Sequence, residues 1–471
     1  MTLRNLANEF LTFVTASPSP FHATEEARKK LVQAGYSEVF EKSSWDGALK
    51  PGGKYFFTRN HSSILAFAIG GQYKRGNGFS IVGAHTDSPC LKVKPRSAKS
   101  RGVYTQVGVE VYGGGLWHTW FDRDLGVAGR VLVHEKDGTI QHRLVRVSRP
   151  ILKIPTLAIH LDRAVNTDGF KFNTETQLLP VLGIAAAKLN EPASSTPPAG
   201  DEKHSSVFLS LLASELKCDI SQIGDFEICL YDTNPACTWG ANNEFISSSR
   251  LDNLNMSFCA LTALINSTTN SSLSDEPLIR VVALFDNEEI GSVSAYGADS
   301  DMMLAALERL SKVEITDSAD RSTSAFEQAM QKSMLISADM GHASHPNYWD
   351  KHEDNHRPKI NSGVVLKMNA NLRYATTAIT TTILREVAKV KGTSLQEFVV
   401  RNDSPCGSTI GPMLSAKLGL RTVDVGNPQW GMHSIRETAG VEDIASAVDL
   451  FQSFFENFSK IDANVQVYHN L

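Results

Sequence analysis

Apolar side chains recur every three or four residues in three parts of the chain. Such spacing places them on one face of an α-helix, and a glycine after the last apolar position is a common end signal. The three sets are Leu3, Leu6, Phe10 and Val14; Ile379, Ile383, Val387 and Val390, followed by Gly392; and Ile444, Val448, Phe451, Phe455 and Phe458. We therefore predict three amphipathic helices whose apolar faces pack into a core.

Short apolar runs of another kind end abruptly in polar residues. Residues 79–83 run into His85, residues 278–285 into Asp286, and residues 334–338 into Asp339. Their length and β-branched content are typical of buried strands. Because helical patterns lie between and after them, the sequence predicts an α/β sheet covered by helices on both faces. The polar residues then fall at the carboxyl ends of the strands, where such sheets bind ligands.

The stretch from residue 91 to residue 243 has a different pattern. Residues 103–111 and 140–147 contain β-type alternation, broken by Gly113-Gly114-Gly115 and by a Pro-rich loop at 191–206. We predict an inserted β-rich domain at 91–243 that interrupts a catalytic domain formed by residues 1–90 and 244–471. The glycine run lacks the spacing of a phosphate-binding loop, so a tight turn is the better interpretation. A second surface loop is predicted at 268–276.

Composition and charge exclude several classes of protein. Of the 471 residues, 42% are hydrophobic and 21% are charged, which excludes fibrous and wholly disordered chains. The net charge of −5 argues against a nucleic-acid partner, and no apolar run has the length of a membrane span. The six cysteines form no Cys-x-x-Cys pair, which fits a reducing compartment. We therefore predict a cytoplasmic protein, with delivery to a vacuole left open.

Two polar clusters at strand ends suggest metal chemistry. His85 is followed by Asp87, and an imidazole can bind a metal while a nearby acid orients it. Asp286, Glu288 and Glu289 follow a buried strand, where neighbouring carboxylates repel unless a cation lies between them. One of the adjacent glutamates could ligate a metal while the other acts as a base. The alternatives are that the first cluster is an ordinary pair of polar surface residues and that the second is a solvated loop.

The full set of candidate ligands favours a site with two metals. Asp252 and Asp339 lie beside apolar residues, and His433 comes late in the chain. Each of these residues alone is more often a helix cap or a satisfied polar group. Together with His85 and Glu289 they supply the nitrogen and oxygen donors that zinc takes, and they leave Glu288 available as a base. Two Zn²⁺ ions and one hydroxide would balance the three carboxylates, and Mn or Co would accept the same donors.

Other residues could contact a substrate. His342 lies three positions after Asp339, whereas His345, His352 and His356 are interpreted mainly as structural or surface residues. Lys367 emerges from the apolar run 364–366 and could recognise a carboxylate, or it could extend its head to solvent at a strand end. Cys406 is not needed as a nucleophile if a metal site is present.

With these residues in view, the sequence resembles the M18 metallopeptidase family over nearly its whole length. The matching strings include residues 17–22, 83–90, 112–117, 120–124, 250–254, 286–289, 337–340, 345–348, 401–403 and 432–436. The resemblance implies one metal held by His85 and Asp339, a second held by Glu289 and His433, and Asp252 bridging them. It makes Glu288 the general base and Asp87 the acid that orients His85. It further implies that His160, Glu288, Asp339, His342, Lys367 and Tyr374 contact substrate.

The resemblance also implies a fold and an activity. The fold would be an αβα peptidase domain interrupted by a β-rich dimerisation domain, which brings His160 into a partner's active site, and the dimers would assemble into a dodecamer. The activity would be the release of N-terminal Asp or Glu from peptides by water activated at two divalent ions. A carboxypeptidase, a broad-specificity aminopeptidase or deacylase on the same scaffold, and a non-catalytic self-assembling shell are the alternatives.

Overall fold

A computed structural model describes residues 3–184, 203–312 and 323–466 of the chain. The chain forms two compact units. The first comprises residues 1–87, 236–432 and 437–471, and the second comprises residues 88–235 and 433–436. The predicted fold class, an α/β domain interrupted by a β-rich one, is confirmed.

The first unit is built on a nine-stranded sheet in the order β1-β2-β3-β13-β4-β14-β18-β16-β17. At its centre β13, β4, β14 and β18 run parallel, while β3 and β16 run antiparallel to their neighbours in this group. The strands are β1 (Ser37–Glu38), β2 (Lys54–Arg59), β3 (Ser63–Ile69), β4 (Phe79–His85), β13 (Ile279–Phe285), β14 (Met334–Ala338), β16 (Val364–Lys367), β17 (Leu395–Phe398) and β18 (Arg421–Gly426). Every residue of β4, β13 and β14 is buried, as expected for parallel strands covered on both faces.

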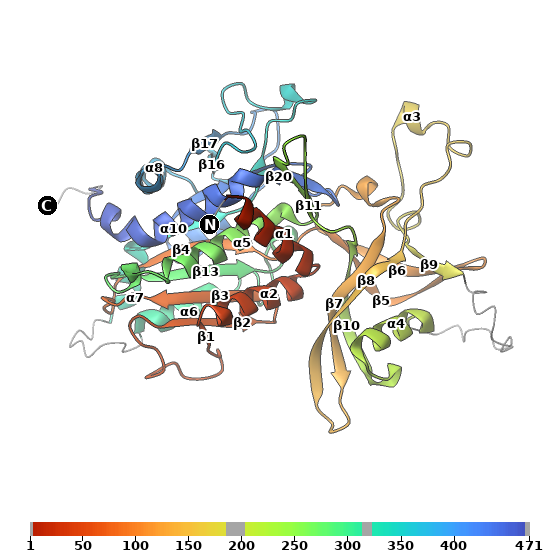
Figure 1. Cartoon of the computed structure of the whole chain (residues 1–471), viewed down its shortest axis with the longest axis horizontal. Coiled ribbons are helices and arrows are strands. Elements are labelled where there is room, and N and C mark those ends of the chain that lie inside the picture. Colours follow the sequence, from red (N-terminus) through yellow and green to blue (C-terminus); the bar gives the residue numbers. More distant parts are fainter. Residues whose placement is uncertain (1–2, 185–202, 313–322, 467–471) are drawn as a thin grey trace. The chain divides into compact units, whose positions relative to one another are not determined.

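Helices cover both faces of this sheet (Figure 1). One face packs against α1 (Leu3–Ala16), α2 (Pro20–Gln33), α5 (Leu251–Ser267), α8 (Ala378–Lys391) and α10 (Val441–Asp462). The other face packs against α6 (Met302–Lys312), α7 (Ala325–Gln331) and α9 (Ile410–Leu418). Alternate residues of a strand enter the two cores: Val282 faces the first set of helices, and Val281 faces the second.

The predicted helices are present. In α1 Phe10 and Val14 are buried, and in α10 the whole predicted stripe is buried. Helix α8 begins at a capping box formed by Thr377 and Thr380 and ends at Gly392, whose φ of 68° is easy for a residue without a Cβ. Of its predicted apolar face, Ile383 and Val387 are buried, whereas Ile379 and Val390 are exposed. The buried face of α8 also includes Leu384 and Ala388, so it is displaced around the helix from the predicted stripe.

A smaller five-stranded sheet belongs to the same unit, in the order β11-β12-β20-β19-β15. Its strands are β11 (Cys237–Trp239), β12 (Phe245–Ser248), β20 (Glu437–Gly440), β19 (Pro428–Trp430) and β15 (Gly341–His342). Strand β19 follows β18 closely, and β15 follows β14 closely. This sheet therefore continues from the carboxyl ends of two central strands.

The second unit is a six-stranded antiparallel sheet in the order β8-β7-β10-β5-β6-β9. The strands are β5 (Cys90–Arg101), β6 (Tyr104–Tyr112), β7 (Leu125–His134), β8 (Ile140–Leu152), β9 (Val181–Ile184) and β10 (Ile223–Asp232). Helix α4 (Ser206–Leu216) packs Phe208 and Leu212 onto the sheet, and a short helix α3 (Val165–Asp168) lies in the loop before β9. This unit has its own apolar core.

The two predicted loops have different outcomes. Most of the loop at 191–206 lies outside the described residues. The segment 268–276 is more than a surface excursion, because Leu273 and Glu276 are buried. Arg280, a fully buried residue of β13, donates hydrogen bonds to the carbonyls of Ser267 and Ser272 and pairs with Glu276 at 3.1 Å. A buried ion pair thus fastens this segment to the sheet.

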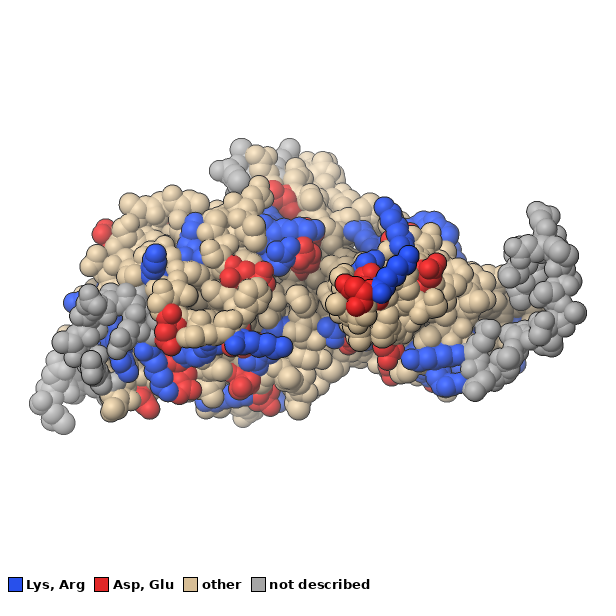
Figure 2. Space-filling view, turned by 90° about the horizontal axis from the view of Figure 1, so that it is seen from below, with Lys and Arg blue, Asp and Glu red and all other residues tan. Residues whose placement is uncertain are grey.

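One face of the molecule carries charged side chains of both signs (Figure 2). On the face shown in Figure 2, Lys and Arg side chains are interspersed with Asp and Glu side chains. Among the described helices, none is both long and apolar enough to span a membrane.

Candidate metal centre

Three neighbouring strands of the large sheet deliver most of the predicted site residues to one edge. His85 ends β4, Asp286 follows β13, and Asp339 follows β14. Because β13, β4 and β14 are adjacent and parallel, their carboxyl ends meet. Asp252 comes from the first turn of α5, which packs against β4, β13 and β14. Residues far apart in the sequence therefore converge because of strand order.

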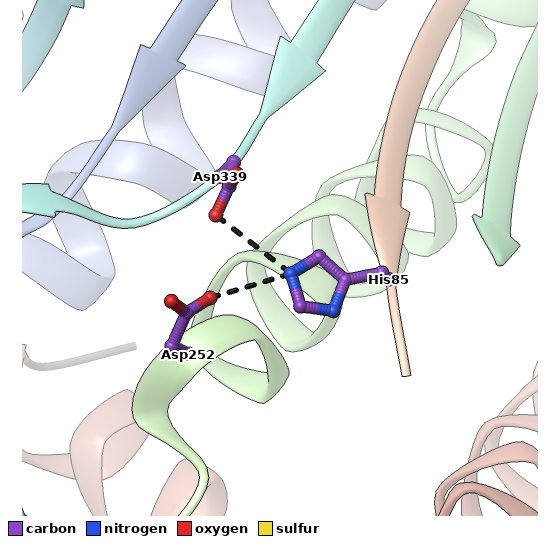
Figure 3. A group of neighbouring side chains, drawn as sticks. All are labelled: His85, Asp252 and Asp339. Atoms are coloured by element: carbon purple, nitrogen blue, oxygen red, sulfur yellow. Dashed lines mark ion pairs between the residues drawn. The ribbon is translucent and has the colours of Figure 1, made fainter. Parts of the chain in front are cut away.

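His85 lies at the centre of a carboxylate cluster. Its Nε2 is 3.3 Å from Asp252 Oδ1 and 3.8 Å from Asp339 Oδ1, and both side chains point toward the ring (Figure 3). Its Nδ1 is 3.2 Å from Asp87 Oδ1. Burial lowers the pKa of His85, yet its hydrogen bonds to Asp252, Asp339 and Asp87 raise that pKa well above the usual value. Such a concentration of buried negative charge calls for a balancing cation.

Asp87 holds two parts of the site together. Its Oδ1 accepts the backbone N–H of Glu288 and its Oδ2 accepts that of Glu289, both at 3.1 Å. The same carboxylate lies beside His85 Nδ1, where an acid can orient an imidazole. Asp87 is fully buried, so these contacts fix the short 3₁₀ turn Glu288–Ile290 relative to His85.

Glu288 is set apart from the other carboxylates by its environment. Its Oε2 is 3.8 Å from His85 Nε2. Burial raises its pKa to about 8; nearby His85 opposes the rise, and the charges of Asp339, Asp252 and Asp87 add to it. A carboxyl group whose pKa lies near neutral pH, and which is within reach of a metal site, has the properties of a proton-transfer group.

The donor set fits divalent cations. Ligand atoms of His85, Asp252 and Asp339 lie within 4.8 Å of one another, and so do those of His85, Glu288 and Glu289. One imidazole and several carboxylate oxygens in so small a space match the ligand types of zinc and of similar ions.

His433 and His160 belong to the second unit. The segment that carries His433 is grouped with that unit, where its Nδ1 is 2.9 Å from the carbonyl of Gly114. The contact engages the Nδ1 atom of the ring. The glycine run therefore contacts His433, which the interpretation as a tight turn did not include. His160 is exposed in the loop between β8 and α3. The metal role of His433 and the substrate role of His160 therefore stay predictions.

Of the predicted substrate residues, Lys367 lies beside Asp339 and Tyr374 lies beside Lys367. Lys367 is only 3% exposed, and its Nζ donates to the carbonyl of Met340 at 2.9 Å and lies 3.9 Å from Asp339 Oδ2. The Tyr374 ring packs 5.1 Å from Lys367 Nζ. His342 is exposed and stacks edge-on against Phe398. The alternative for Lys367, a head group extended to solvent, is wrong for the structure described.

Two acids that support this site were missed in the sequence. Glu437 is buried, and its carboxylate accepts the backbone N–H of Asp252 at 3.1 Å. Asp424 lies fully buried in β18, beside Lys367 of β16. Each had a weak signal: Glu437 directly follows the motif around His433, and Asp424 interrupts an apolar strand. Neither signal identifies a partner, because the partners come from other elements.

Comparison with known proteins points to one family. A family model described as aminopeptidase I zinc metalloprotease (M18) matches residues 13–455. An aspartyl aminopeptidase of Aspergillus oryzae is 51% identical, over 99% of this chain and 98% of its own. A cryo-EM structure of an Ape4–Nbr1 complex is similar with a TM-score of 0.95 and 48% identity, over 99% of this chain and 88% of that chain. The structure of an mApe1 dodecamer from Saccharomyces cerevisiae is similar with a TM-score of 0.84 and 28% identity, over 97% of this chain and 98% of that chain.

Proposed function

This chain belongs to the M18 family of zinc metalloproteases, and on that premise we propose that it is an aminopeptidase that releases N-terminal Asp or Glu from peptides. The observation that carries the proposal is the buried Lys367 ammonium, 3.9 Å from a carboxylate of the candidate metal centre. A cation at that place can pair with the acidic side chain of an N-terminal residue while the peptide bond after that residue lies at the metals. Relatives named aspartyl aminopeptidase support the same specificity.

Two divalent ions, most simply zinc, are proposed as cofactors. His85 and Asp339 would hold one, Glu289 and His433 the other, and Asp252 would bridge them. Such ions polarise a scissile carbonyl and make water a nucleophile near neutral pH. The cluster around His85 supports this assignment through its donor types and its excess of negative charge.

Glu288 is proposed as the general base. It takes the proton from the attacking water and passes it to the leaving amine as the peptide bond breaks. Its position in a turn held by Asp87 keeps the carboxylate beside His85 without requiring it as a ligand. Asp87 acts on the reaction only through the groups that it orients.

Self-association is the remaining part of the proposal. The loop that carries His160 also exposes Leu157, Ile159 and Leu161, the last by 75% of its surface. Exposed apolar side chains grouped in one loop are typical of a surface that another chain covers. We therefore propose a dimer in which this loop enters the partner's site, and a dodecamer like that of mApe1.

A cytoplasmic location is proposed as well, since all six cysteines are free.

A substrate panel tests the proposed activity. Matched peptides with N-terminal Asp, Leu or Lys are offered to the purified protein before chelation, after chelation and after metal is restored. We expect release of Asp in preference to the others, lost with the chelator and recovered with Zn, Mn or Co. Release without acidic preference would leave a broader aminopeptidase. No release by a metal-loaded, assembled sample would favour the deacylase or the shell.

Replacing Lys367 tests the origin of the specificity. We expect Lys367→Met to lower kcat/KM for N-terminal Asp by about 10- to 100-fold, the cost of a lost charge-assisted bond, with little change for N-terminal Ala. Lys29→Ala removes a lysine that pairs with Glu26 on helix α2 and serves as the control. An equal loss for both substrates would reject the specificity role.

A further inference from the structure

Asp424 is a buried acid that the proposed mechanism does not use. It lies between Val423 and Val425 in β18, and all three residues are fully buried. An acid in such a place requires hydrogen-bond donors, because burial in apolar surroundings disfavours an unpaired polar group. Its backbone is paired directly with that of Lys367.

The two carboxylate oxygens of Asp424 bind two different loops. Oδ1 accepts a hydrogen bond from Thr409 Oγ1 at 2.5 Å, and Oδ2 accepts one from the backbone N–H of Ala375 at 2.6 Å. The start of α9 lies so close that a Cβ on Gly411 would be 2.5 Å from Oδ2. A glycine is therefore required there for the carboxylate to stay in place.

The same two loops also bind each other. Arg373 donates from Nε to the carbonyl of Cys406 at 3.2 Å, and Ser408 Oγ donates to the carbonyl of Arg373 at 3.1 Å. Tyr374 is enclosed by this arrangement and packs with Val365 and Phe398. The position of the Tyr374 ring thus depends on both loops, and both loops are fastened to Asp424.

Tyr374 and Thr376 connect this network to Lys367. The Tyr374 ring lies 5.1 Å from Lys367 Nζ, a cation–π distance. Thr376 Oγ1 donates to the carbonyl of Lys367 at 2.6 Å and accepts the backbone N–H of Asp424 at 2.9 Å. Asp424 therefore supports both the backbone of Lys367 and the ring that confines its ammonium.

We propose that Asp424 is a positioning residue for acid recognition: its carboxylate fastens the loops at residues 373–376 and 406–409, which hold Tyr374 against Lys367. A binding group discriminates well only when its neighbours restrict it to one geometry. If the loops loosen, the ammonium gains other positions and pairs less well with a substrate carboxylate. The inference rests on the proposed role of Lys367 in binding acidic N-termini.

The test compares peptides that begin with Asp or with Asn, which have the same shape and differ in charge. Asp424→Asn replaces one of the two acceptor oxygens with an amide nitrogen that cannot accept a hydrogen bond, and Thr409→Val removes one donor while leaving Asp424 unchanged. We expect each to lower the Asp-to-Asn ratio of kcat/KM by about tenfold, mainly through a higher KM for Asp, as for a weakened charge-assisted bond. Thr409→Ser keeps the hydroxyl donor and should retain the ratio. Bound metal should stay at the wild-type amount throughout.

Glu276→Gln is the matched control, because it makes the same carboxyl-to-amide change at another buried acid, whose ion pair with Arg280 of β13 lies outside this network. It should leave the Asp-to-Asn ratio unchanged. An unchanged ratio in both Asp424→Asn and Thr409→Val would overturn the inference, and so would an equal loss for both peptides. If the wild-type protein shows no preference for Asp over Asn, the proposed role of Lys367 in acid recognition is rejected, whatever the variants show.

Discussion

Glu288→Gln is expected to lower kcat by about 10²- to 10⁴-fold, the usual contribution of a general base, while KM and bound metal stay near their wild-type values. The amide has nearly the shape of the carboxylate but accepts no proton. The backbone N–H of residue 288 still donates to Asp87, so the turn that carries Glu289 should be retained. Steady-state kinetics and metal analysis of the same sample measure both effects.

Glu289→Gln is the matched control, because Glu289 is proposed as a ligand and its variant should lose metal together with activity. Near-normal turnover of Glu288→Gln would show that Glu288 is not the base, and loss of metal from this variant would show that Glu288 is a ligand instead.

The same variant also tests the role of His160. If His160 acts in a partner's site, mixing His160→Phe with Glu288→Gln should restore part of the activity once subunits exchange. No recovery after verified exchange would reject that role.

Arg280→Met is expected to lower the free energy of unfolding by about 3–5 kcal/mol, because it leaves the Glu276 carboxylate buried without its cation. Arg280 also holds the carbonyls of Ser267 and Ser272, so the segment between α5 and β13 loses its anchor. Urea unfolding followed by circular dichroism measures the change. Activity of the folded variant should persist, since Arg280 lies six residues before Asp286 along the strand, about 20 Å away.

The double variant Arg280→Met/Glu276→Met removes both charges and is the control for this prediction. It should recover part of the lost stability, because no buried charge is then left unpaired. A single variant as stable as the wild type would show that the ion pair does not hold this segment. The comparison also separates a stability effect from a catalytic one, because neither residue is near the metal centre.

Local patterns were reliable where one element decides the outcome. The apolar stripe of α10 and the fully buried strands β4, β13 and β14 follow from side-chain periodicity, which depends only on neighbouring residues. The exposed Ile379 and Val390 show the limit of that reasoning. A helix with apolar residues on a wide face buries only those that its neighbours cover, and the neighbours of α8 are α10 and β18.

The sequence by itself determined the class of chemistry: acids and histidines at the ends of apolar runs, and motifs in the order typical of M18 peptidases. Only the tertiary structure decided which of these residues meet. His85, Asp252 and Asp339 converge because β4 lies between β13 and β14 and α5 packs across them. It also showed the support of Lys367 by Asp424, which comes from an antiparallel pairing of two strands distant in the chain. Periodicity specifies a residue's own element, whereas contacts between elements depend on strand order and packing, which no local pattern contains.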